Sequence, residues 1–132
     1  MIVFDSSVFI DQLRTNCHAR RMGANQELVR NCSVVLAELW RGATTPAERV
    51  FLRALEKTYP IWTPTESHWI ESGQILEAIG RKHGFEARKL RDLHFDVLIA
   101  LTARAHGATL ITSNREDFEL IRGFREFKME VW

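Results

Sequence analysis

The stretch Leu93–Thr112, L-H-F-D-V-L-I-A-L-T-A-R-A-H-G-A-T-L-I-T, joins an apolar helical pattern to a short β-type run. It predicts a helix over Asp92–His106 that stops at Gly107, and then a strand over Thr109–Thr112. A helix that leads directly into a buried strand is typical of proteins in which strands and helices alternate. Asp96 lies on the apolar stripe of this helix, where burial of an acid is costly unless something compensates its charge.

The rest of the chain continues the alternation of short β-type runs and longer helical patterns. The other predicted strands are Ile2–Phe4, Cys32–Val34, Tyr59–Trp62 and, at an edge of the sheet, Phe127–Trp132. The other predicted helices are Ser7–Leu13, one or two short ones within Arg14–Arg30, Val35–Gly42, a helix capped by Thr45 and ending near Lys57, Glu66–His83, and Asp117–Ile121. In the helix Glu66–His83, Gly73 and Gly80 share a stripe and are expected to permit close packing.

This alternation predicts an α/β fold in a single domain over residues 1–132, with a mostly parallel sheet of about four to five strands covered by helices on both faces. In such sheets ligands bind beyond the carboxyl ends of the strands, near the point where the strand order reverses. Asp5, Asn114 and Asp117 each follow a predicted strand and are therefore expected at this functional edge.

Composition excludes several classes of protein. The net charge of the 132 residues is +1, so any contact with nucleic acid must depend on local charge. Cys17 and Cys32 have no metal or redox spacing, which favours a reduced, cytoplasmic protein. The N-terminal run is broken by Asp5, unlike a signal peptide, and no apolar stretch approaches the ~20 residues that span a membrane. Gly-rich phosphate loops, zinc-ligand spacings and Ser or Cys nucleophile motifs are absent from the sequence.

Three carboxylates carry the functional argument. Asp5 ends the apolar run Ile2–Phe4, whereas Glu38 and Asp96 lie inside apolar helical segments without a basic residue among the apolar neighbours. If the three converge, a bound divalent cation is the natural compensation for their charge, which makes a metal-dependent enzyme the leading hypothesis. The alternatives are a helix cap at Asp5, a snorkelling or ion-paired edge residue at Glu38, with Arg41 as the candidate partner, and a buried structural acid at Asp96.

Asn114 and Asp117 are more ambiguous. They lie in Thr112–Phe118, T-S-N-R-E-D-F, where Ser113–Glu116 also fits a capping box. Asn114 is thus either a metal ligand or a turn residue, and Asp117 is either a metal ligand or a surface acid.

Three segments occur in a fixed order along the chain: I-V-F-D-S-S-V-F-I (2–10), S-V-V-L-A-E-L-W-R-G (33–42) and F-D-V-L-I-A-L-T-A-R-A-H-G-A-T-L-I-T-S-N-R-E-D-F (95–118). Together they resemble the PIN-domain family, and more narrowly the VapC-type toxins of bacterial toxin–antitoxin pairs. The resemblance implies a Mg²⁺- or Mn²⁺-dependent endoribonuclease with a three-layer fold. It also implies a homodimer and a VapB-type antitoxin that wraps the toxin and blocks its site.

The resemblance further implies roles for individual residues. Asp5, Glu38 and Asp96 match the three acidic positions of the family, as catalytic metal ligands, and Glu38 is a candidate to orient the attacking water. Asn114, where many members carry an acid, and Asp117 are expected to assist the metal shell. The supporting hydroxyls, expected to hydrogen-bond carboxylates or phosphate, are those of Ser7 and Thr112.

A basic cluster is the candidate surface for RNA phosphates. Within eleven residues it sets five positive charges against one acid, Glu86; the basic residues are Arg81, Lys82, Arg88, Lys89 and Arg91. The alternatives for this cluster are a solvated helix end and loop, which is the simpler interpretation, and a contact with an acidic antitoxin segment. The alternative function for the whole chain is a degenerate PIN-fold binding module without catalysis, which the neutral Asn114 favours.

Overall fold

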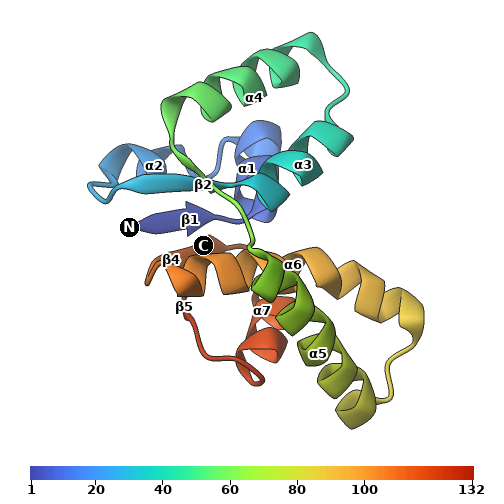
Figure 1. Cartoon of the computed structure of the whole chain (residues 1–132). Helices are drawn as coiled ribbons and strands as arrows, with labels where there is room; N and C mark the ends of the chain where they lie inside the picture. Colours follow the sequence, from blue (N-terminus) through green and yellow to red (C-terminus); the bar gives the residue numbers. More distant parts are fainter.

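One parallel sheet runs through the computed structural model, which describes residues 1–132 (Figure 1). Its five strands are β1 (Ile2–Phe4), β2 (Val29–Cys32), β3 (Ile61–Trp62), β4 (Thr109–Thr112) and β5 (Lys128–Val131), in the spatial order β3-β2-β1-β4-β5. All four neighbouring pairs are parallel. The predicted α/β fold with its mostly parallel sheet is confirmed, and β5 is an edge strand as expected.

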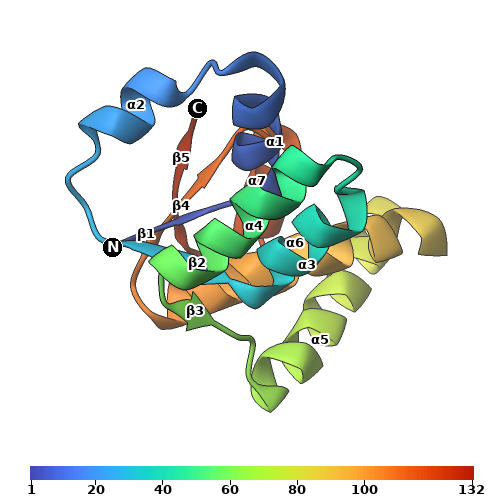
Figure 2. The ribbon, with the colours of Figure 1, turned by 90° about the horizontal axis from the view of Figure 1, so that it is seen from above.

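Seven helices cover the two faces of the sheet. They are α1 (Ser6–Thr15), α2 (Ala19–Ala24), α3 (Ser33–Gly42), α4 (Pro46–Thr58), α5 (Glu66–His83), α6 (Ala87–Ala105) and α7 (Arg115–Arg122). The chain builds β1, β2 and β3 toward one edge and then returns to add β4 and β5 at the other. Because parallel crossovers are right-handed, this reversal places α1–α4 on one face and α5–α7 on the opposite face. Figure 2 shows α1 and α2 on one side of β1 and β2, with α5 and α6 on the other.

The second strand is shifted from its predicted position. The sequence predicts Cys32–Val34, whereas β2 covers Val29–Cys32 and α3 begins directly at Ser33. Pairing decides this boundary, since Ile2 lies opposite Val29 and the next residue of β1 lies opposite Arg30. Pairing with the neighbouring strand therefore holds this polar segment in an extended conformation, although its local sequence favours a helix.

The α5–α6 hairpin, whose yellow connection projects away from the strands in Figure 1, also differs from expectation. Helix α6 begins at Ala87, not at Asp92. A Cβ atom on Gly80 would lie 2.9 Å from Cδ1 of Leu90, so the predicted close packing at this glycine is confirmed. The same prediction is wrong at Gly73, which has open space around it. Close contact between α5 and the first turns of α6 is thus part of what makes the basic segment helical.

The carboxyl ends of β1 and β4 meet where the strand order reverses. The two strands are neighbours, and the backbone N–H of Asp5 donates to the carbonyl of Ile111 at 2.8 Å. The residue after β1 and the last residue of β4, Thr112, therefore lie at the switch point of the sheet. None of the helices combines the length and apolar character needed to cross a bilayer.

Candidate metal centre

The three acids that stand out in the sequence converge beside the switch point. One carboxylate oxygen each from Asp5, Glu38 and Asp96 lies within 4.8 Å of the other two. Asp5 follows β1, Glu38 lies in the middle of α3, and Asp96 lies in α6. Two helices and one strand end, distant in sequence, thus bring three charges of the same sign together.

Asp5 is almost fully buried, and its two carboxylate oxygens have different surroundings. Its Oδ2 accepts hydrogen bonds from Ser7 Oγ at 2.7 Å and from Thr112 Oγ1 at 3.0 Å. The same oxygen caps α1 by accepting from the Ser7 backbone N–H at 3.4 Å, so the capping alternative is also realised. Its Oδ1 is buried and has no hydrogen-bond partner. A buried carboxylate oxygen without a donor is destabilising, and a cation among the three acids would satisfy it.

Glu38 reaches the cluster from α3. Its Oε1 accepts a hydrogen bond from Ser6 Oγ at 3.4 Å. Burial, and then the charge of Asp5, raises the pKa of Glu38 to about 7, against a smaller lowering by Arg41. The guanidinium of Arg41 lies 5.8 Å from the ring centroid of Phe95 and forms no salt bridge with Glu38, so the ion-pair alternative is not observed.

Asp96 is the most strongly perturbed member of the cluster. Burial raises its pKa to about 8, and the charges of Asp5, Glu38 and Asp117 add to this effect, while Lys89 opposes it. Without a cation, the cluster therefore holds protons near neutral pH that isolated carboxyls lose near pH 4. Three carboxylates, one with an unsatisfied buried oxygen, are a donor set that fits a hard divalent cation such as Mg²⁺ or Mn²⁺.

Asn114 and Asp117 lie to one side of this cluster and bond to each other. Asn114 is the N-cap of α7, and its Oδ1 accepts from the Asp117 backbone N–H at 3.4 Å. Its Nδ2 donates to Asp117 Oδ2 at 3.1 Å, and Lys89 Nζ donates to Asp117 Oδ1 at 3.1 Å. The capping box predicted at Ser113 is thus wrong, since the cap is the next residue. Whether this pair assists the metal shell stays a prediction.

The basic cluster is spread over the α5–α6 hairpin. Arg81 forms a salt bridge with Glu77 at 3.1 Å, and Lys82 Nζ lies 5.4 Å from the ring centroid of Phe124. Arg88 and Arg91 are exposed on α6. Of the five basic residues, only Lys89 bonds to a residue beside the acidic cluster.

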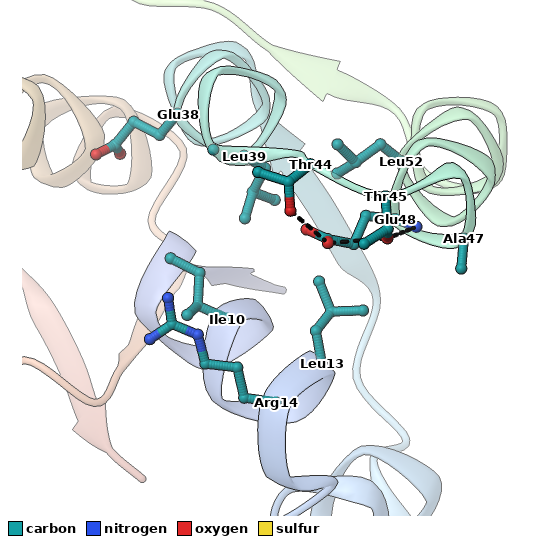
Figure 3. A pocket seen from close by; sticks show the side chains of 11 residues that line it. Ile10, Leu13, Arg14, Glu38, Leu39, Thr44, Thr45, Ala47, Glu48 and Leu52 are labelled. Atoms are coloured by element: carbon teal, nitrogen blue, oxygen red, sulfur yellow. Dashed lines mark hydrogen bonds between the residues drawn. The ribbon is translucent and has the colours of Figure 1, made fainter.

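A groove of about 500 Å³ lies between α1, α3 and α4 and has Glu38 at one end (Figure 3). Its walls are largely apolar and include Ile10, Leu13 and Leu39, with Arg14 as a basic side chain on its lining. The acidic cluster is therefore adjacent to a surface that can accept an apolar segment.

Two contacts of the site are not predicted from the sequence. The first is the bond of Ser6 to Glu38, although the place of Ser6 next to Asp5 at a helix start puts a hydroxyl near the cluster. The second is the pairing of Lys89 with Asp117, because the predicted helix begins at Asp92 and leaves Lys89 in a loop. A helix start at Ala87 would have placed Lys89 two turns before Asp96, on the same face.

Comparison with known proteins agrees with the observed fold. The model of the PIN domain family matches residues 2–123. DNA-bound VapBC from Salmonella typhimurium has a chain 21% identical to this one, with a TM-score of 0.75 over 99% of this chain and 97% of that chain. VapBC2 from Rickettsia felis, bound to a promoter DNA fragment, is 19% identical with a TM-score of 0.72 over 100% and 99%. FitAcB from Neisseria gonorrhoeae is 22% identical with a TM-score of 0.67 over 98% and 96%. No curated protein sequence matches the chain.

Proposed function

The chain belongs to the PIN domain family, since that family's model matches residues 2–123, and from this premise we propose that it is a metal-dependent endoribonuclease, the VapC-type toxin of a toxin–antitoxin pair. We propose that it hydrolyses RNA phosphodiesters with Mg²⁺ or Mn²⁺ at Asp5, Glu38 and Asp96. The observation that carries the proposal is the buried, unpartnered Oδ1 of Asp5 where three carboxylates meet within 4.8 Å. A fold kept only for binding has no need for this destabilising arrangement.

The cation would supply a water activated at neutral pH and positive charge for the phosphoryl group in the transition state. The residues of the chain bind and orient the groups of the site. Ser7 and Thr112 both donate to Oδ2 of Asp5, which fixes the carboxylate and leaves Oδ1 free for a ligand. Glu38, whose Oε1 accepts a hydrogen bond from Ser6 Oγ, is placed to bind the cation or to orient the attacking water. Asp96, approaching from α6, completes the set of carboxylates.

We also propose a VapB-type antitoxin as the partner, and a homodimer as the assembly. The Salmonella typhimurium and Rickettsia felis relatives are VapBC and VapBC2 bound to DNA. The groove that has Glu38 at one end is the surface that best suits an antitoxin segment, because a segment seated there would reach one member of the acidic cluster. Replacing Leu13, which lines the groove and is partly exposed, by Glu should abolish neutralisation by the antitoxin and leave RNA cleavage intact.

The test of the proposed function is cleavage of a mixed RNA pool by the purified, antitoxin-free chain with Mg²⁺, with Mn²⁺ and with EDTA. We expect cleavage that requires the metal and that is lost in Asp96→Asn, which removes one ligand charge at constant size. Asp92→Asn is the matched control, because Asp92 is exposed on the same helix. If the folded wild type cuts no RNA with either metal and neither ion raises its stability, the degenerate binding module becomes the better explanation.

A further inference from the structure

Lys89 is the one basic side chain that bonds beside the acidic cluster. Its Nζ lies 3.1 Å from Oδ1 of Asp117, and its side chain is 41% exposed. An ammonium group has three N–H donors, so at least two of them remain available to a ligand from solvent. Lys89 is also close enough to Asp96 to lower the pKa of that acid. A positive charge that faces both the cluster and solvent is therefore built into this part of the site.

The register of α6 explains why this lysine and not its neighbours reaches the site. Lys89 precedes Asp96 by seven residues, which turns the helix by about two turns and leaves the two side chains about 20° apart. Arg88 and Arg91 are rotated from Asp96 by about 80° and about 140°. The basic cluster is thus not uniform, because only one of its members on α6 shares the face of the catalytic acid.

Helix stability does not account for a lysine at this position. Lys89 lies in the first turn of α6, where the helix dipole disfavours a cation, and that turn contains no acidic residue. Its N-cap, Glu86, makes no capping hydrogen bond from its side chain. The amino end of α6 therefore adds its partial positive charge to that of Lys89, and together they favour an anion.

Hydrogen bonds connect Lys89 to the acidic cluster through β4 and α7. Thr112 Oγ1 donates to Asp5 Oδ2 at 3.0 Å and accepts from the Asn114 backbone N–H at 2.9 Å. Asn114 Nδ2 then donates a hydrogen bond to Oδ2 of Asp117, and Lys89 Nζ donates to Oδ1 of the same carboxylate. Both oxygens of Asp117 and both polar atoms of the Asn114 side chain are engaged in this chain of contacts. They are arranged to hold a lysine in place.

We propose that Lys89 binds the phosphate of the RNA at which cleavage occurs, and that Asp117 and Asn114 position this lysine and are not ligands of the cation. The inference rests on the proposed ribonuclease function and adds to it a residue that touches the substrate. Its reaction role is electrostatic: the ammonium stabilises negative charge on the phosphate and exchanges no proton with it. Asp117 thereby has a role that differs from the one expected from the sequence.

The first test compares Lys89→Met, Lys89→Arg and, as a matched control, Lys57→Met, which removes the same charge from the exposed end of α4. The single-turnover rate of RNA-pool cleavage with Mn²⁺ should fall about 100-fold in Lys89→Met. It should stay within about tenfold of wild type in Lys89→Arg and be unchanged in Lys57→Met. Cleavage by Lys89→Met within threefold of the wild-type rate would overturn the inference.

A second readout separates phosphate binding from a structural role. Binding of Mn²⁺ alone, measured by titration calorimetry, should be unchanged or tighter in Lys89→Met, because a nearby positive charge repels the cation. Binding of a labelled 2′-O-methyl RNA pool should show a smaller slope of log affinity against log salt, by about 0.7, as expected for one lost phosphate contact. Loss of Mn²⁺ affinity in this variant, or an unchanged salt slope, would contradict the inference.

A double-mutant cycle tests the role of Asp117. If Asp117 acts by holding Lys89, Asp117→Asn should slow cleavage in the wild-type background and add little when Lys89 is already Met. If Asp117 is a ligand, its replacement should weaken Mn²⁺ binding by tenfold or more in both backgrounds, and the inference fails. Failure of the proposed function is distinguishable from this result, because then the wild type itself shows neither metal-dependent cleavage nor an effect of Asp96→Asn on Mn²⁺ binding.

Discussion

The replacement of Asp96 by Asn should stabilise the metal-free protein, and by more at higher pH. Burial and the charges of Asp5, Glu38 and Asp117 raise the pKa of Asp96 from 3.8 to about 8, and no hydrogen bond is among the factors that stabilise its charge. Each pH unit is worth about 1.36 kcal/mol, so the ionised carboxylate destabilises the folded chain by up to roughly 6 kcal/mol. Solvent screening reduces this, and we expect a measured gain of about 2 kcal/mol or more at pH 8.

The sign of the pH dependence follows from proton binding. Between about pH 4 and pH 8 the folded chain holds a proton at Asp96 that the unfolded chain has lost. The free energy of unfolding of the wild type therefore falls as the pH rises through this window. In Asp96→Asn that contribution is absent, so the two proteins should be nearly equal in stability at pH 4 and should diverge toward pH 8.

The assay is urea unfolding in EDTA at several pH values, followed by the fluorescence of the four tryptophans. Asp92→Asn, on the exposed face of the same helix, should follow the wild type at every pH. Addition of Mn²⁺ at pH 8 should stabilise the wild type, by about 2.7 kcal/mol at a concentration 100 times the dissociation constant, and should stabilise Asp96→Asn much less. Equal stabilities of wild type and Asp96→Asn at pH 8 in EDTA would refute the electrostatic reasoning.

The remaining predictions concern packing and the hydrogen bonds of the site. Gly73→Ala should raise the free energy of unfolding by about 0.5–1 kcal/mol, because the helix interior there has open space, whereas Gly80→Ala should gain less, because the new methyl group displaces the side chain of Leu90. Equal effects of the two substitutions in urea unfolding would contradict this packing. Ser7→Ala should lower the free energy of unfolding by about 1–3 kcal/mol and slow RNA cleavage, since it removes the 2.7 Å donor to buried Asp5. Full cleavage activity in that variant would show that the carboxylate needs no such support.

Local pattern predicted most of the fold. The periods of apolar residues and the glycine after α6 predicted the alternation of helices and strands, and Gly107 adopts the left-handed conformation, φ 65°, that such a stop requires. The predicted element boundaries that are wrong are those that depend on contacts with another strand or helix. The strand β2 is set by its pairing with Ile2, and the start of α6 by contact with α5 at Gly80. A local sequence pattern carries no information about either of these contacts.

The sequence by itself determined that the chain forms a parallel α/β sheet and that Asp5, Glu38 and Asp96 are acids set among apolar residues. The period of apolar residues can be read from neighbouring positions of the sequence, and so can an acidic residue that occupies an apolar position of that pattern. Only the tertiary structure decided that the three carboxylates meet within 4.8 Å, and that one oxygen of Asp5 is left without a donor while the other is held by a threonine 107 residues away. It likewise decided that Lys89 reaches Asp117. Distances of this kind arise when strands and helices far apart in the chain pack together, and burial in that packing is what changes the charge, the pKa and the chemistry of the acids.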